Sequence, residues 1–282
     1  MPGALSILLA LSLLSGCASI VSSATSRMAD NITLAILNQD DPATVRDGAP
    51  AYLLMIDGLI EGDPGNQSLL LAGAKLYGSY TTAFIEDEAR AKRLAEKSLA
   101  YARRALCLEV AEICAAADSK FEQFTDSLAQ TGPGELRVVY AFAAAWATWI
   151  RVNASDWNAV ADLSKVTALF ERCVEIDETY DGGGAHVYLG VIKSLMPAAL
   201  GGKPEIARQH FERAIEISAG KNLMISVLMA KHYARNVFDR VLHDQLLTAV
   251  KAADVGHFGY TLSNTLAKIE ADKLLVEAEA FF

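Results

Sequence analysis

The amino-acid sequence predicts an all-α protein of tetratricopeptide-like helical hairpin repeats, an α-α superhelix with capping helices at its N- and C-terminal ends. Two observations lead to this prediction. Apolar residues recur every three or four positions through most of the 282 residues, and no segment alternates as a β-strand does. In addition, three consecutive segments of the C-terminal half place small and aromatic residues where such repeats pack their two helices together.

The chain opens with a pattern for secretion and lipidation. Residues 4–14 are apolar but shorter than the ~20 residues of a membrane span, and Leu14-Ser15-Gly16-Cys17 has the form of a lipobox. We therefore expect a lipoprotein signal peptide over 1–16, a lipid anchor on Cys17 and a lipidated tether over 17–30. Residues 1–16 contain no Lys or Arg, so an ordinary cleaved signal with an incidental cysteine is the alternative.

Helix signals follow one another along the N-terminal half. The apolar spacing predicts helices over 48–61, 66–84, 86–108 and 135–153. Pro50 falls near the start of the first of these, where a proline is tolerated, and the Gly- and Pro-containing stretch 62–66 closes it with a turn. Residues 115–134 show no sustained period, so we predict that they are mostly loop.

The C-terminal half contains three repeat-like units and a capping helix. Their key positions are Val166, Phe170 and Cys173 in the first unit, Leu189, Gly190, Ala207, Phe211 and Ala214 in the second, and Met229, Ala230, Tyr233, Leu242, Leu246 and Ala249 in the third. The spacing of Phe170, Phe211 and Leu246 is looser than the 34-residue period of tetratricopeptide repeats. A last helix over 261–279 is expected to cap the stack, because the outer face of a terminal repeat meets water.

Composition and charge limit the class of partner. Lys and Arg number 25 and Asp and Glu 34, which gives a formal net charge of −9. This balance argues against nucleic acid as a partner, because binding to phosphates needs an excess of basic residues. After the leader and tether, no Pro- or Ser-rich linker divides the chain, so we expect a single all-helical domain over 31–282.

Four cysteines occur, at positions 17, 107, 114 and 173. If Cys107 and Cys114 lie on one continuous helix, their Cα atoms are about 10 Å apart, beyond the ~7 Å that a disulfide spans. A bridge between them therefore requires a break in the helix. We expect buried free thiols, and a Cys107–Cys114 disulfide is the alternative.

The usual sequence patterns of catalysis and metal binding are missing. The five histidines form no His-Glu-x-x-His pair, and neither Cys-x-x-Cys nor Gly-x-Ser-x-Gly occurs. The glycines at 182–184 and 201–202 follow no predicted strand, so turns between helices explain them better than phosphate loops. We therefore predict no enzymatic activity, no metal and no cofactor. A hydrolase built from carboxylates that converge only in the fold is the alternative.

The segment 140–157 concentrates aromatic residues and supplies most of the candidates for binding. One interpretation is packing, in which Trp146 and Trp149 fill the core and Ser155 or Asp156 caps the next helix. The other is that the apolar helix lines a cavity or a subunit interface, because helical repeats form concave surfaces that hold ligands. For His186, packing is a better explanation than ligation. The candidate pore, ligand or interface residues are Tyr140, Trp146, Trp149, Asn153, Trp157, His186, Tyr188 and Gly190.

Several short segments occur in a fixed order over some two hundred residues. They are Cys17, Asp47-Gly48-Ala49-Pro50, residues 53–59, Asp63-Pro64-Gly65-Asn66, residues 149–157, Glu171-Arg172, residues 175–180, Gly183-Gly184-Ala185-His186, Gly190, Pro197, Gly201-Gly202-Lys203-Pro204 and residues 207–211. In this order they resemble the lipoprotein T component (TatT-like) of tripartite ATP-independent periplasmic (TRAP) transporters. The resemblance covers nearly all of the chain after Cys17.

The resemblance implies an accessory role in transport. It implies an all-α fold of helix pairs, a homotrimer, and an apolar pore or cavity through each protomer. It also implies docking to a periplasmic solute-binding protein and a hydrophobic or organic-acid ligand. Ala18 after Cys17 is similar to the pattern of lipoproteins sorted to the outer membrane, which places the anchor in its periplasmic leaflet. The alternative is a tetratricopeptide lipoprotein that scaffolds envelope assembly and has no closed cavity.

Overall fold

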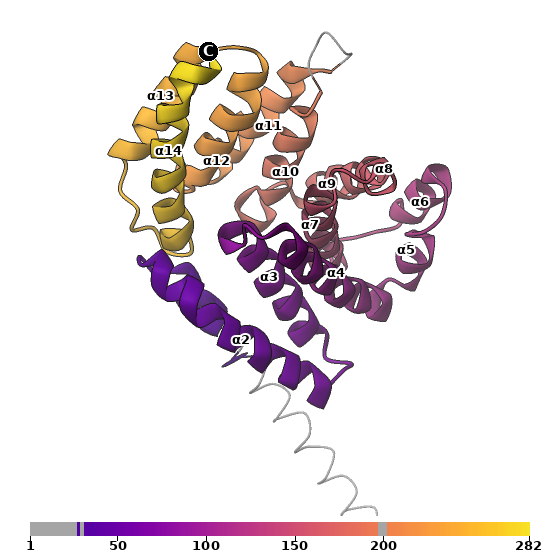
Figure 1. Cartoon of the computed structure of the whole chain (residues 1–282). Helices are drawn as coiled ribbons and strands as arrows, with labels where there is room; N and C mark the ends of the chain where they lie inside the picture. Colours follow the sequence, from indigo (N-terminus) through magenta and orange to yellow (C-terminus); the bar gives the residue numbers. More distant parts are fainter. Residues whose placement is uncertain (1–26, 29–30, 197–201) are drawn as a thin grey trace, which may run out of the picture.

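The computed structural model describes residues 27–28, 31–196 and 202–282, and every regular element in these ranges is a helix (Figure 1). The predicted all-α class is therefore confirmed. The predicted signal peptide, the lipid-bearing Cys17 and most of the tether lie outside the described residues, as do Pro197 and Gly201.

The helices follow one another with short connections. The N-terminal ones are α2 (Pro42–Gly62), α3 (Gln67–Phe84), α4 (Glu88–Glu109), α5 (Ala111–Ala116), α6 (Phe121–Leu128), α7 (Leu136–Val152) and α8 (Trp157–Ala161). The C-terminal ones are α9 (Leu163–Asp177), the 3-10 turn η1 (Tyr180–Gly182), α10 (Gly184–Lys193), α11 (Pro204–Ile217), α12 (Leu223–Leu228), the π-helical turn η3 (Met229–Ala234), α13 (Arg240–Ala252) and α14 (Thr261–Phe281).

Helix α2 begins six residues earlier than the sequence predicts. Asp41 caps it by accepting a hydrogen bond from the Ala43 amide, and Pro42 rather than Pro50 occupies the first turn. Pro50 lies inside the helix, where it has no N–H to donate to the carbonyl of Arg46. The hydroxyl of Tyr80 donates to that carbonyl at 3.1 Å instead, so a tertiary contact satisfies the group that the proline leaves unpaired.

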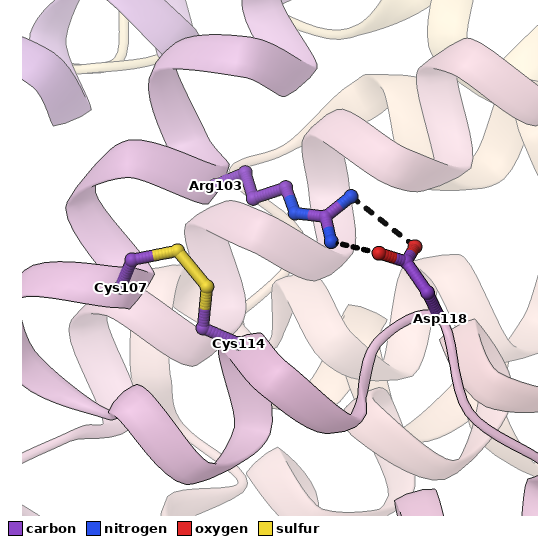
Figure 2. The surroundings of a disulfide bond; sticks show 4 residues. All are labelled: Arg103, Cys107, Cys114 and Asp118. Carbon is purple, nitrogen blue, oxygen red and sulfur yellow. Dashed lines mark hydrogen bonds and ion pairs between the residues drawn. A yellow bond between two sulfur atoms is a disulfide. The ribbon is translucent and has the colours of Figure 1, made fainter.

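The break after α4 corrects two predictions. Cys107 and Cys114 form a disulfide with their Cα atoms 5.1 Å apart, which is possible because the helix ends at Glu109 and the chain turns at Val110 into α5 (Figure 2). The expectation of free thiols is wrong for this pair, whereas Cys173 is a buried free thiol. The predicted loop over 115–134 also contains helix α6, whose short apolar face buries Phe124 and Leu128.

Consecutive helices pack in pairs along the chain, and the two ends of the array meet. Helix α3 packs against α4, α7 against α9, α10 against α11, and α12 with η3 against α13. Two hydrogen bonds, from Arg137 to Ser68 and from Arg151 to Thr82, each link residues 69 apart, so α3 and α7 run in the same direction. Helix α2 contacts both α3 and α14, as Figure 1 shows at the end where α2 begins.

The repeat positions explain where the core lies. Phe170 and Cys173 of α9 and Phe211 of α11 are fully buried, and the rings of the phenylalanines fill the space between helix pairs. In the third unit the prediction is off by one position on α13. His243, Leu247 and Val250 are buried there. Leu242 and Leu246 are only half-buried and Ala249 is exposed.

Candidate functional site

The tryptophans of the predicted aromatic site lie in different environments. Trp146 is buried in the core, where its ring centroid is 5.1 Å from that of Phe142 and 6.1 Å from that of Phe124. Trp149 is half-buried at the edge of the same core. Trp157, the first residue of α8, is 86% exposed. The three side chains therefore form no common site.

Asn153 and Gly190 have packing roles. The side chain of Asn153 donates a hydrogen bond to the Trp149 carbonyl at 2.9 Å and closes the end of α7. At Gly190, an added Cβ would lie 3.0 Å from the ring of Phe211, so glycine allows α10 and α11 to approach each other closely. The sequence predicts that Gly190 and Phe211 pack together in the second helix pair, and this contact agrees with that prediction.

His186 belongs to a polar group between α9, α10 and α11. Its Nδ1 lies 2.8 Å from Nδ1 of His210, and its Nε2 lies 3.2 Å from the carboxylate of Glu178. Arg213 donates to Glu178 at 3.0 Å, and this bond lowers the pKa of Glu178 to about 2. Burial, reinforced by His186, lowers the pKa of His210 to about 4. The group ties three helix ends together, which is a packing role for His186.

Tyr140 and Tyr188 do come together, and further residues join them. We define the tyrosine cluster as Tyr140 of α7, Tyr180 and Asp181 of η1, Tyr188 of α10, and Tyr260 before α14. The ring of Tyr140 lies 5.2 Å from that of Tyr180 and 6.4 Å from that of Tyr188, between centroids. The Tyr140 hydroxyl donates to the Asp181 carboxylate at 2.8 Å. The cluster thus joins three helical segments around one carboxylate.

The glycine run beside Asp181 gives the tyrosine hydroxyls their space. Asp181 has φ = 50°, and Gly182 and Gly183 also have positive φ, so the chain makes a tight left-handed turn between α9 and α10. A Cβ at Gly182 would overlap the hydroxyl of Tyr260, and one at Gly184 would overlap the hydroxyl of Tyr140. The prediction of a turn rather than a phosphate loop agrees with this geometry.

Three basic side chains lie along the face that α3 and α7 share. Nζ of Lys75 lies 3.7 Å from the Asp181 carboxylate. Arg137 and Arg151, at the two ends of α7, donate to hydroxyls of α3, at 3.3 Å to Ser68 and 3.2 Å to Thr82. Of these three cations, Lys75 is the one that pairs with the Asp181 carboxylate, and the two arginines contact α3 at the opposite ends of α7.

The electrostatics of the cluster suit binding. Burial, followed by the charge of Asp181, raises the pKa of Tyr140, Tyr180 and Tyr260, and burial raises the pKa of Tyr188 to about 12. All four hydroxyls therefore stay protonated at neutral pH, and that of Tyr140 donates to Asp181. Within the described ranges, no group of three or more His, Cys, Asp or Glu side chains is arranged to hold a metal ion.

Only part of this cluster had a sequence signal. The aromatic sequence pattern predicts Tyr140 and Tyr188 as candidates, and the glycines after Asp181 predict a turn there. Lys75 and Tyr260 lie some 80 to 110 residues from this turn in the sequence and reach it only through the fold. Lys75 comes from α3, which packs beside α7, and Tyr260 immediately precedes α14.

The fold defines a class: an all-helical protein whose consecutive helices pack in pairs. The chain belongs to the family of TRAP transporter T-components, whose family model matches residues 38–282. The predicted family is therefore confirmed, and membership implies an accessory role in TRAP transport rather than an enzymatic one. No curated protein matches the chain. None of the helices in the described residues has both the length and the hydropathy needed to cross a bilayer.

Proposed function

We propose that this protein is a periplasm-facing lipoprotein subunit of a TRAP transport system that docks a periplasmic solute-binding protein. The family match over 38–282 is the observation that carries the proposal. The paired packing of α3 with α4, α7 with α9 and α10 with α11 supports a tetratricopeptide-like superhelix, in which each pair covers the apolar face of the next. We include residues 31–282 as one domain in this proposal.

The proposed ligand is hydrophobic or an organic acid, and it binds at or passes through an apolar pore of the protomer. The location of Tyr140 and Tyr188 in the tyrosine cluster supports placing the ligand near this cluster. Trp146 and Gly190 no longer belong among the candidates for contact with the ligand, because both are enclosed by core side chains. Trp157 remains a candidate for contact with a partner, since its ring is open to solvent.

Docking is tested by co-purification. The full chain with a C-terminal affinity tag is expressed in its native host, the envelope is solubilised, and the captured proteins are identified by mass spectrometry. We expect a periplasmic solute-binding protein at near-equal amount. A matched Trp157→Ala variant tests the exposed ring as a contact. Repeated capture of envelope-assembly proteins without any solute-binding protein would favour the scaffold alternative and refute the proposal.

The anchor and the assembly are tested separately. Metabolic labelling with an alkyne fatty acid should label the wild-type chain and leave Cys17→Ala unlabelled. Ala18→Asp should move the protein from the outer-membrane to the inner-membrane fraction of a density gradient. The proposed homotrimer predicts three times the 30.2 kDa chain mass, less the leader, in light scattering of the detergent-corrected complex. A monomer at micromolar concentration would exclude a stable trimer.

A further inference from the structure

We propose that the outer face of α4 binds the surface of an anionic phospholipid bilayer. We define the arginine face as the residues that follow one another at helical spacing along this side of α4: Arg90, Arg93, Lys97, Arg104 and Leu108. The inference goes beyond the docking of a partner protein. Only its choice of a membrane as the occupant rests on the proposed lipid anchor.

Helix α4 is basic in a chain that is acidic overall. It carries six arginines and lysines but only three glutamates, whereas the whole chain has a formal net charge of −9. Each glutamate lies at least about a quarter-turn around the helix from the arginine face. The two remaining cations, Lys92 and Arg103, lie off this face and pair with Glu88 and Asp118, the second pair being visible in Figure 2. Positive charge is therefore concentrated on one side of α4, which suits an anionic partner.

Within the described ranges, the three arginines of this face pair with no carboxylate. The guanidinium of Arg90 lies 5.7 Å from the ring centroid of Tyr80, and Arg104 donates to the Pro64 carbonyl at 3.1 Å. The side chain of Arg93 makes no hydrogen bond, ion pair or ring contact with any residue that the structure describes. All three are exposed. An external anion can thus form charge-assisted hydrogen bonds with them without breaking an existing ion pair.

The spread of the face favours an extended surface over a small anion. Arg90 and Arg104 are about 21 Å apart along the helix axis, so the arginines cannot converge on a single phosphate group. Lys97 lies between them but pairs with Asp57, and the arginines therefore supply the net charge. Leu108 ends the face and is 56% exposed. Exposed apolar side chains next to cations are typical of helices that lie on a membrane interface.

The position of the face favours a membrane over an acidic protein. Tyr80, below Arg90, donates to the Arg46 carbonyl at 3.1 Å, so the face begins beside the start of α2, to which the N-terminal segment leads. The proposed anchor at Cys17, outside the described residues, precedes Asn31 by fourteen residues, which span at most about 50 Å. This tether holds a bilayer close to the protein and raises the effective concentration of headgroups at the face.

The test removes the acyl chains so that only the face can bind. The mature chain from residue 17 is produced with Cys17→Ser, and its binding to vesicles is measured by flotation in a density gradient. The vesicles contain phosphatidylcholine alone or phosphatidylcholine with about 30% phosphatidylglycerol. We expect at least about tenfold tighter binding to the anionic vesicles. Raising NaCl from about 50 mM to about 500 mM should abolish this difference, because salt screens the charges.

Variants locate the binding on α4. Arg90→Gln, Arg93→Gln and Arg104→Gln should each weaken binding to the anionic vesicles by about fivefold, and the three together should remove the preference for them. Substituting Lys at the same three positions keeps the charges and should retain most of the binding. The charge-matched control changes three exposed lysines of the C-terminal half and should bind within about twofold of the unsubstituted chain. These changes are Lys203→Gln, Lys221→Gln and Lys273→Gln.

Circular dichroism verifies that each variant is folded. If the triple Gln variant is not, Arg93→Glu takes its place, because the Arg93 side chain has no contact in the described structure whose loss could unfold the chain. This single charge reversal should weaken binding to the anionic vesicles by at least about tenfold.

Equal binding to both kinds of vesicle, unchanged binding of the folded arginine variants, or an equal loss in the lysine control overturns the inference. Labelling of Cys17 with the alkyne fatty acid separates this failure from failure of the proposed anchor. A labelled wild-type chain whose Cys17→Ser form ignores anionic vesicles keeps the anchor and refutes the membrane contact. If the triple Gln variant instead loses a co-purified protein while vesicles are not bound, the face binds a protein and the proposal is wrong.

Discussion

Removing the carboxylate of Asp57 should destabilise the contact between α2, α3 and α4. Asp57 of α2 accepts hydrogen bonds from the Tyr77 hydroxyl at 2.8 Å and the Tyr101 hydroxyl at 2.7 Å, and also from Lys97. Its side chain is only 19% exposed. Lys97 also lies over both tyrosine rings. The carboxylate thus connects three helices through one acceptor group.

The size of this destabilisation follows from the hydrogen bond that each partner of Asp57 loses. Tyr77 and Tyr101 are 4% and 6% exposed, so neither hydroxyl is fully solvated when the carboxylate is absent. Each unpaired hydroxyl costs about 1–1.5 kcal/mol, and the more exposed Lys97 adds less than about 1 kcal/mol. We therefore expect Asp57→Ala to lower the free energy of unfolding by about 3 kcal/mol. Asp57→Asn should cost about half as much, since its amide oxygen still accepts one hydrogen bond.

The pH dependence gives an independent measurement. Burial raises the pKa of Asp57, but the hydrogen bonds from Lys97, Tyr101 and Tyr77 outweigh it and the net pKa is lowered. The folded state therefore favours the carboxylate. Its contribution is fully present above the pKa of the unfolded chain, about 3.9, and is lost as the pH falls through the folded pKa. The difference between wild type and Asp57→Asn should therefore shrink on acidification from pH 7 to pH 3.

The assay is urea unfolding followed by circular dichroism at 222 nm, on the full chain at both pH values. Asp47→Asn is the matched control, because Asp47 lies on the same helix with its side chain 68% exposed beside Arg46. This control should change stability by less than about 0.5 kcal/mol. If Asp57→Ala costs no more than the control at pH 7, the carboxylate does not connect the three helices and the reasoning is wrong.

Three further predictions concern the rest of the fold. Cys107→Ser with Cys114→Ser should lower the free energy of unfolding by about 2.5 kcal/mol, because the bridge closes a short loop. Dithiothreitol should then have no further effect on this double variant. An equal response of the wild type and the double variant to the reductant would contradict this prediction. Gly184→Ala should lower the free energy of unfolding by about 1–3 kcal/mol, measured by thermal or urea unfolding, because its Cβ would overlap the Tyr140 hydroxyl. Tyr140→Phe in the same chain should recover most of this loss. If the costs of the two substitutions simply add, the overlap is not the cause. Burial, with the charge of His186, lowers the pKa of His210 to about 4, below the unfolded value of about 6.5. The contribution of His210 to the free energy of unfolding should therefore be fully present above pH 6.5 and fall by about 2 kcal/mol between pH 6.5 and 4. His210→Gln should flatten this pH dependence, and an unchanged pH dependence would assign it to other groups.

Much of the fold was predictable because its signals are local. The helices over 67–84, 88–109 and 136–152 follow from apolar spacing and from side chains that cap their ends, such as Asn66 and Asp87. The errors arose where tertiary contacts override a local rule. Pro50 lies within α2 because Tyr80 from another helix satisfies the freed carbonyl. The bridge between Cys107 and Cys114 forms because the chain turns at Val110 between α4 and α5, a turn that brings the two Cα atoms to 5.1 Å.

The candidate site was predictable only in part. The concentration of aromatic residues predicts Trp146 and Trp149 as candidates, but a side chain that faces the core has the same spacing along a helix as one that lines a binding face. What separates Trp146 from Tyr140 is which helices cover them. That information lies in contacts between residues tens of positions apart, such as Lys75 with Asp181.

The linear order of residues by itself determined the helical class, the positions of most helices and the family. These properties depend on the periodicity of neighbouring residues and on motifs read along the chain, and neither needs a partner distant in sequence. The tertiary structure alone decided that Cys107 meets Cys114 and that Tyr140, Asp181 and Tyr260 share one cluster. The physical reason is that bonding partners and local charge are set by distances in space, and these exist only once the helices have packed.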